Sequence, residues 1–236
     1  MKKSLNNLAT KTTVAVKRRP KRVERHLFTP LARDAIAGLE DGLDIFGFTK
    51  GQFSFVDLID AVLGITGPAK VTVCTWTAAA ADASFLGGWC KQGRIEEFRL
   101  LIDYSFLNRL GGQDAVDEVV RHFGSDAVRV TRTHAKWGII SGKKLEIAVL
   151  TSMNLNKNPR FEYFHATSDP EVVKLLNGIA QEVWDSPEFA DALKMRPQEH
   201  KDRFGQVGES DREPPSPLDA VDFDLGLDDF DPDLGL

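Results

Sequence analysis

The order of apolar segments between Ser54 and Trp184 is the feature that most limits what this chain can fold into. Short segments rich in β-branched residues, typical of buried strands, alternate with segments whose apolar residues recur every three or four positions, typical of helices. The predicted strands span residues 70–76, 97–103, 127–131, 136–141 and 145–151, and the predicted helices span residues 55–63, 82–90, 114–123 and 170–184. From residue 70 the order is β-α-β-α-β-β-β-α, which predicts an α/β or α+β domain with a largely buried sheet.

Caps and turns mark several of these boundaries. Ser54 can cap the helix that begins at Phe55, and Gly64 can end it. Asp169 followed by Pro170 is typical of the start of a helix. Residues 141–144 form a tight turn that joins two strands as a hairpin.

Charge divides the chain into three parts. Residues 1–25 contain nine Lys and Arg against one acid, whereas residues 209–236 contain ten acids against one Arg, within a net charge of −5 for the whole chain. We expect a flexible basic arm over residues 1–26, a folded domain over 27–196, and a disordered linker with an acidic tail over 197–236.

Both ends allow more than one interpretation. The basic arm fits a nucleic-acid patch, a nuclear-localisation signal, an organelle transit peptide, or a terminus that only keeps the protein soluble. The acidic tail repeats a DFD…LGL unit at residues 222–228 and 229–236. Interleaved acids, Phe and Leu favour docking to an unknown protein partner or masking of the basic surface, and the alternative is an acidic tail with no partner.

Composition excludes several classes of protein. Hydrophobic residues make up 42% and charged residues 28%, which is an ordinary globular balance. No apolar stretch approaches the roughly 18 residues that span a bilayer, and no apolar segment marks secretion. The two cysteines, Cys74 and Cys90, fit neither a disulfide framework nor a metal pair. We therefore expect a cytoplasmic protein that is not bound to a membrane.

Polar residues are predicted to converge at one end of the hairpin. If the turn is centred on Gly142 and Lys143, residues whose numbers sum to about 286 lie opposite each other. His134 would then lie near Ser152, and Lys136 near Leu150. Alternation along each strand places Lys136 on the face of His134 and Asn154 on the face of Ser152, and Glu162 follows shortly afterwards.

Such a group of residues suits a phosphate. Lys136 supplies a positive charge, and Ser152 and Asn154 can donate hydrogen bonds to phosphoryl oxygens. His134 can act as a nucleophile or as a general acid or base, with Glu162 orienting its ring. No metal-ligand spacing accompanies them, so we expect metal-independent chemistry without a cofactor. The alternative is a surface His-x-Lys beside residues that only shape a turn.

These residues also resemble a known family. His134-Ala135-Lys136, followed by TSMNLNKNPRFE at residues 151–162, is similar to the signature of the phospholipase D-like superfamily, whose members carry HxK, an Asp, a GS-x-N segment and usually a later Glu. The similarity covers residues 53 to about 184. The sequence of residues 152–162 also resembles that of phage- and prophage-borne members of the family. The resemblance implies a mixed β-sheet flanked by helices.

The resemblance also implies a mechanism. In that family one histidine attacks phosphorus to give a phosphohistidine, and the histidine of a second motif protonates the leaving group. This chain has one such motif, and the single-motif nucleases of the family work as homodimers. The resemblance makes His134 the nucleophile or the acid, with Lys136 and Asn154 binding phosphate, Ser152 supporting them and Glu162 orienting the histidine.

Two positions depart from the family pattern. The family's Asp would fall at Ser141, and its glycine before the serine is Thr151. We expect a metal-independent phosphodiesterase, a nuclease acting as a homodimer on nucleic acid, with DNA favoured over RNA. The alternatives are a catalytically inactive DNA-binding or adaptor protein on the same fold and, with less support, a lipid phosphodiesterase.

Overall fold

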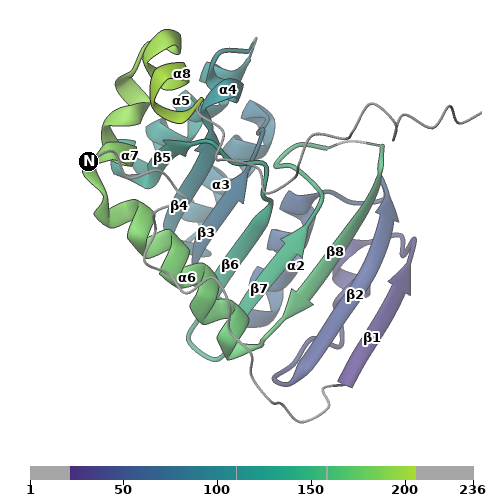
Figure 1. Ribbon diagram of the computed structural model, residues 1–236. Helices are drawn as coiled ribbons and strands as arrows, with labels where there is room; N and C mark the ends of the chain where they lie inside the picture. Colours follow the sequence, from purple (N-terminus) through teal and green to yellow (C-terminus); the bar gives the residue numbers. More distant parts are fainter. Residues whose placement is uncertain (1–21, 110, 158, 206–236) are drawn as a thin grey trace, which may run out of the picture. The chain divides into compact units, whose positions relative to one another are not determined.

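Eight strands form one mixed sheet in the computed structural model, which describes residues 22–109, 111–157 and 159–205 (Figure 1). Along the sheet the strand order is β1-β2-β8-β7-β6-β3-β4-β5. The strands are β1 (Arg22–Leu27), β2 (Leu43–Lys50), β3 (Ala69–Thr75), β4 (Ile95–Asp103), β5 (Val128–Thr131), β6 (Trp137–Gly142), β7 (Glu146–Thr151) and β8 (Phe161–Thr167). The mixed α/β class that the sequence predicts is therefore confirmed.

Helices flank this sheet. They are α1 (Ala32–Ala35), α2 (Phe55–Thr66), α3 (Ala80–Lys91), α4 (Tyr104–Leu107), α5 (Gly112–Phe123), α6 (Pro170–Asp185), α7 (Pro187–Ala190) and α8 (Pro197–Phe204), with 3-10 turns at Ser125–Ala127 and Asp191–Lys194. The predicted start of α2 is confirmed, because Ser54 and Asp57 form a reciprocal capping box there. Asp169 caps α6, as its sequence predicts. Among the described residues, no helix is long and apolar enough to cross a membrane.

Strand direction brings distant segments to one end of the sheet. β3, β4 and β5 run parallel, while β6 is antiparallel to β3, β7 to β6, and β8 to β7. The carboxyl ends of β3, β4, β5 and β7 therefore lie beside the starts of β6 and β8. Ligand sites of α/β sheets commonly form at such ends, because the connecting loops gather there.

The surroundings of Gly138 indicate that α2 and α6 cover opposite faces of the sheet. A Cβ at Gly138 in β6 would lie 3.2 Å from the Phe55 ring of α2. Trp137 and Ile139 flank Gly138 and point to the opposite face, where they are buried and where α6 packs against β6 and β7. In Figure 1, α6 crosses this face of the sheet, but no described helix lies over the same face of β8, β2 and β1.

The folded part extends beyond the boundaries that the sequence predicts. Residues 22–26, assigned to a flexible arm, belong to β1, which pairs in parallel with β2 at the edge of the sheet. An edge strand needs little apolar surface, so its polar composition hid it. Residues 197–204, assigned to a linker, form α8, which buries His200 and Phe204. The remainder of the predicted arm and the acidic tail lie outside the described residues.

Candidate active site

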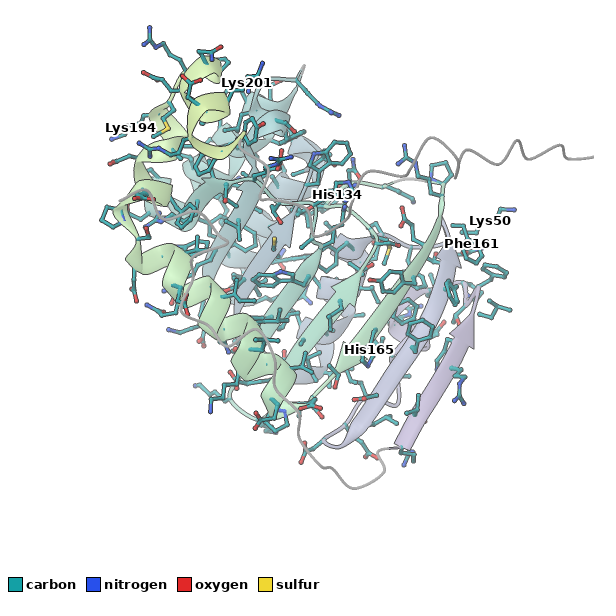
Figure 2. The ribbon with its side chains drawn as sticks, viewed as in Figure 1. Lys50, His134, Phe161, His165, Lys194 and Lys201 are labelled. Carbon is teal, nitrogen blue, oxygen red and sulfur yellow. The ribbon has the colours of Figure 1, made fainter. Side chains whose placement is uncertain are left out.

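The residues expected to carry chemistry lie at the shared end of the strands. His134 and Lys136 lie just before β6, Ser152 and Asn154 follow β7, and Glu162 is the second residue of β8. Figure 2 shows His134 at this end of the sheet. His134 is exposed, Lys136 is buried, and Ser152, Asn154 and Glu162 are half-buried. The site therefore combines the accessible imidazole of His134 with the buried ammonium of Lys136.

Lys136 is held against His134. Its Nζ lies 3.0 Å from Nδ1 of His134 and donates a hydrogen bond of 2.6 Å to the His134 carbonyl oxygen. Burial lowers the pKa of Lys136 below its ordinary value, although the negative charges of the Glu162 and Asp103 carboxylates partly oppose this effect. An incompletely solvated ammonium beside an exposed imidazole is suited to bind an anion that the imidazole can attack.

Asp103 anchors the loop that carries His134. This buried carboxylate, at the carboxyl end of β4, accepts a 2.7 Å hydrogen bond from the Thr133 N–H through Oδ2. Its Oδ1 accepts hydrogen bonds from the N–H and the hydroxyl of Ser105, at 2.8 and 2.5 Å. Thr133 Oγ1 in turn accepts from the Ala135 N–H at 3.2 Å. Asp103 is thus a positioning residue, and the sequence analysis missed it because nothing near residue 103 suggests contact with residue 133.

Cys74 completes the support beneath this loop. Its Sγ lies 3.5 Å from Thr133 Oγ1 and 3.6 Å from the carbonyl oxygen of Ala135. Burial raises the pKa of the Cys74 thiol to about 12, so the side chain is a neutral thiol at physiological pH. Cys74 therefore packs and supports the loop and offers no thiolate.

Ser152 and Glu162 form a second pair on the other side of the site. The Ser152 hydroxyl donates to Oε2 of Glu162 and accepts from the Tyr163 N–H at 3.0 Å. The Thr151 hydroxyl donates to the Tyr163 carbonyl oxygen at 2.6 Å, which fixes the end of β7 against the start of β8. Glu162 also acts electrostatically on Lys136. The structure thus brings His134, Lys136, Ser152 and Glu162 into one cluster.

Asn154 lies in the same loop but has no hydrogen bond to this cluster among the described residues. Its Oδ1 is buried without a hydrogen-bond partner there. The next residue, Leu155, is fixed by hydrogen bonds from its N–H to the Thr77 carbonyl oxygen and to Thr75 Oγ1, both 3.1 Å. This loop therefore crosses to the carboxyl end of β3, where Asn154 keeps an unused acceptor.

An aromatic side chain that the sequence analysis did not single out borders the site. The Trp76 ring lies 5.0 Å from the His134 ring, and the Lys136 ammonium stands 5.9 Å from the Trp76 centroid. The guanidinium of exposed Arg109 lies 4.6 Å from the same centroid. Trp76 follows β3 directly, so its place among cations depends on the strand order and not on a local motif. It provides an apolar wall beside His134 with a second cation at its rim.

The predicted register is wrong by one residue. Lys136 was expected opposite Leu150, but Trp137 pairs with Leu150, and the Lys136 carbonyl oxygen accepts from the Thr151 N–H. The turn is centred one residue later than expected because Gly142 belongs to β6. A Cβ at Gly142 would lie 2.7 Å from Cβ of Thr66, so close packing against α2 requires this glycine inside the strand.

Ser141 lies at the far end of β6 from His134. It pairs with Glu146 and Lys70 and borders a small cavity of about 160 Å³. A strand advances about 3.3 Å per residue, so several residues of β6 separate Ser141 from the cluster. An Asp at this position would not reach His134, and the Ser141 departure leaves the geometry around His134 intact.

The other four histidines of the chain have partners elsewhere. His26 faces Glu24, His122 contacts Glu118, His165 faces Asp44, and His200 bonds the carbonyl oxygen of Ala192. Within one chain, His134 is therefore the single imidazole of the cluster. The described residues also contain no group of three or more His, Cys, Asp or Glu side chains that could hold a metal ion.

Comparisons with known proteins give little beyond this geometry. No family model and no curated protein matches the chain. Among solved structures, the crystal structure of polyphosphate kinase from Porphyromonas gingivalis is similar, with a TM-score of 0.45 and 13% sequence identity over 61% of this chain. The matched region spans 26% of the kinase chain. A likeness of this size carries no argument about activity, so the chemistry rests on the geometry of the site.

Proposed function

We propose that this protein is a phospholipase D-like, metal-independent phosphodiesterase that cleaves nucleic acid, with DNA favoured over RNA. One observation carries the proposal: an exposed histidine lies directly against a buried lysine, and Ser152 and Glu162 pair beside them, at an end of the sheet where loops converge. A phosphodiester is an anion that an ammonium can hold and that an imidazole can attack.

The proposed first step is a displacement at phosphorus. An imidazole nitrogen of His134 forms a bond to phosphorus, the P–O bond to the leaving oxygen breaks, and that oxygen takes a proton from an acid. Water then attacks the phosphohistidine, and the P–N bond breaks to return the imidazole. Lys136 stabilises the negative charge that develops on the non-bridging oxygens. In the proposed mechanism the Asn154 amide donates a hydrogen bond to the same phosphate.

The mechanism needs an acid for the leaving group, and this need leads to the second part of the proposal, that the protein acts as a homodimer. The cluster holds one imidazole, and the other histidines of the chain have partners elsewhere. A two-fold axis close to the exposed His134 would bring two copies of this residue to the same phosphate. One copy would then attack phosphorus while the other protonates the leaving group.

Charge supports nucleic acid as the substrate. Seven of the first 21 residues are Lys or Arg and none is acidic. Such a segment binds a phosphate backbone with little dependence on base sequence and with strong dependence on salt.

The test compares wild type with His134→Ala on labelled single- and double-stranded DNA in EDTA. His122→Ala is the matched control, because His122 lies on α5 with its own partner, Glu118. The proposal predicts cleavage by wild type and by His122→Ala and none by His134→Ala, with DNA binding retained in all three. Equal cleavage by His134→Ala would overturn it. Binding without cleavage by wild type would favour the DNA-binding adaptor.

A further inference from the structure

The open face of β1, β2 and β8 carries aromatic side chains. The exposed fraction is 60% for Phe161, 38% for Tyr163, 36% for Phe46 and 39% for Phe28. Contiguous apolar surface of this kind on a folded domain usually marks a binding site, because its exposure to water costs free energy. We refer to the rings of Phe28, Phe46, Phe48, Phe161, Tyr163 and His165 as the aromatic platform.

Strand pairing places these rings on one side of the sheet. Phe46 pairs with His165, and Phe48 pairs with Tyr163. Leu150 in β7 pairs with His165, and it also pairs with Trp137, which faces α6. The platform thus continues the face that α6 covers over β6 and β7. It begins where that helix no longer lies over the sheet (Figure 1).

The rings are ordered by one another. Phe48 stacks on Phe161 with centroids 5.0 Å apart, and Phe46 stacks on Tyr163 at 6.1 Å. Phe28 meets Phe161 edge-on at 5.8 Å. Phe28 has φ +52°, a conformation that L side chains rarely adopt, and its N–H donates to the Phe48 carbonyl oxygen. The chain thus bends unfavourably to bring this ring against the platform, which favours a functional surface.

Cations border the platform. Arg25 pairs with Phe46, and Lys50 pairs with Phe161, so both point to the same face as the rings, and both are exposed. Exposed Arg160 directly precedes Phe161. Asp44 lies on this face too, but its carboxylate is occupied by the Thr167 hydroxyl at 2.5 Å and by His165 at 3.7 Å. The three cations Arg25, Lys50 and Arg160 outnumber Asp44, so the net charge of these four residues is positive.

The platform and the candidate active site share the start of β8, where successive side chains point to alternate faces. Phe161 and Tyr163 flank Glu162, whose carboxylate bonds Ser152, and the Tyr163 backbone bonds Ser152 and Thr151. Figure 2 places His134 and Phe161 at the same end of the sheet and His165 farther along it. A flexible strand bound at His134 could therefore continue over the start of β8 onto the rings.

We propose that the aromatic platform binds unpaired bases of a single-stranded nucleic acid whose backbone passes His134, an inference that rests on the proposed phosphodiesterase function. Unpaired bases offer their flat faces to aromatic side chains, while nearby cations bind the phosphates. Bases in a duplex are already stacked on one another and do not offer these faces. The protein therefore prefers single-stranded substrate.

The test measures binding by fluorescence anisotropy in the His134→Ala background, which prevents cleavage. The probes are a labelled oligothymidylate of about 20 nucleotides, longer than one stacking site, and a duplex of equal length. The test variant is Phe161→Leu/Tyr163→Leu, which keeps apolar bulk but removes the rings. Phe85→Leu on α3 is the control, because Phe85 is also 60% exposed.

The proposal predicts that the double variant binds oligothymidylate about tenfold more weakly, as expected for lost base stacking. Duplex binding, and all binding by Phe85→Leu, should not change. Unchanged oligothymidylate affinity, or equal losses for both probes, would overturn the proposal. Light scattering that shows the double variant converting a dimer to monomers would also overturn it, because a second copy would then cover the platform.

Ultraviolet crosslinking gives a second readout that does not depend on these substitutions. Irradiated complexes of the His134→Ala protein with oligothymidylate should yield adducts at Phe161, Tyr163 or His165 by peptide mass spectrometry. Adducts confined to other residues would overturn the platform. Cleavage by wild type with unaltered binding by the double variant would reject the platform alone, whereas a tenfold binding loss without cleavage would reject the nuclease alone.

Discussion

The candidate active site around His134 and the aromatic platform both include residues of β8, but they differ in polarity and in burial. Around His134, polar groups are buried or half-buried and held by short hydrogen bonds: Asp103 anchors the loop, and Ser152 bonds Glu162. On the aromatic platform, large rings are exposed and touch mainly one another. A rigid polar cluster can stabilise developing charge, whereas exposed rings gain most by contacting a ligand. This difference supports the proposal that chemistry takes place in the first region and that the second region binds substrate.

The largest effect is expected on replacing Lys136, which belongs to the candidate active site and not to the platform. Lys136→Met should lower turnover about 10²- to 10³-fold, because it removes a donor from the charge that develops on phosphorus. Affinity for oligothymidylate should fall much less, since the platform is unaltered. Steady-state kinetics with anisotropy measurements check both quantities. Lost affinity with unchanged turnover would reverse the assignment of the two regions.

The pH dependence of phosphate binding gives a second test of Lys136. Burial lowers the pKa of Lys136, so its ammonium loses its proton at lower pH than an ordinary lysine. Affinity for inorganic phosphate, measured by calorimetry above about pH 8 where the ligand charge is constant, should therefore weaken early as pH rises. Lys136→Arg should retain affinity to higher pH, because a guanidinium stays charged. Identical pH profiles would contradict this role.

Asp103→Asn should have an intermediate effect. The amide keeps one acceptor oxygen in place of two, because its NH2 group donates, so it cannot satisfy all three donors that the carboxylate holds. A small displacement of reacting groups can cost about 10²-fold in rate, so turnover should fall by up to that factor with KM little changed. Kinetics and thermal melting of Asp103→Asn beside Asp114→Asn, an exposed carboxylate on α5, check this prediction. Equal behaviour of the two variants would show that Asp103 does not position the loop.

Removing residues 209–236 should have the smallest effect. This segment carries nine net negative charges, ten acids against one Arg, and should compete with nucleic acid for basic residues. The shortened protein should bind DNA several-fold more tightly at low salt, with the difference shrinking as salt rises. Turnover at saturating substrate should stay the same. Unchanged affinity at low salt would exclude the masking role and leave the tail free for a protein partner.

Sequence patterns predicted the centre of the fold better than its edges. The helix at Ser54 and the strands from β3 to β7 carry strong local signals, so they were found. β1, β2 and β8 are not predicted. β1 is a polar edge strand, and Phe46 and Phe48 occupy the less buried side of β2, so its sequence lacks the apolar-polar alternation of a strand with one face in water. The platform depends on these three strands, so local reasoning could not reveal it.

The candidate site shows the same limit. His134, Lys136, Ser152 and Glu162 were grouped from spacing, although the register was one residue wrong. Asp103, Trp76 and Cys74 join the site only through the pairing of β3 with β4 and β6. Such residues are separated from His134 by long stretches of chain, so their roles depend on topology.

The proposed mechanism requires His134 to form a covalent bond to phosphorus. The most direct test is acid-free quenching of wild type during cleavage of an oligonucleotide, followed by peptide mass spectrometry. If His134 is the nucleophile, the peptide that contains it carries a nucleotide adduct during turnover, and this adduct is absent from His134→Ala. An adduct on another residue, or cleavage that persists in His134→Ala, would contradict it.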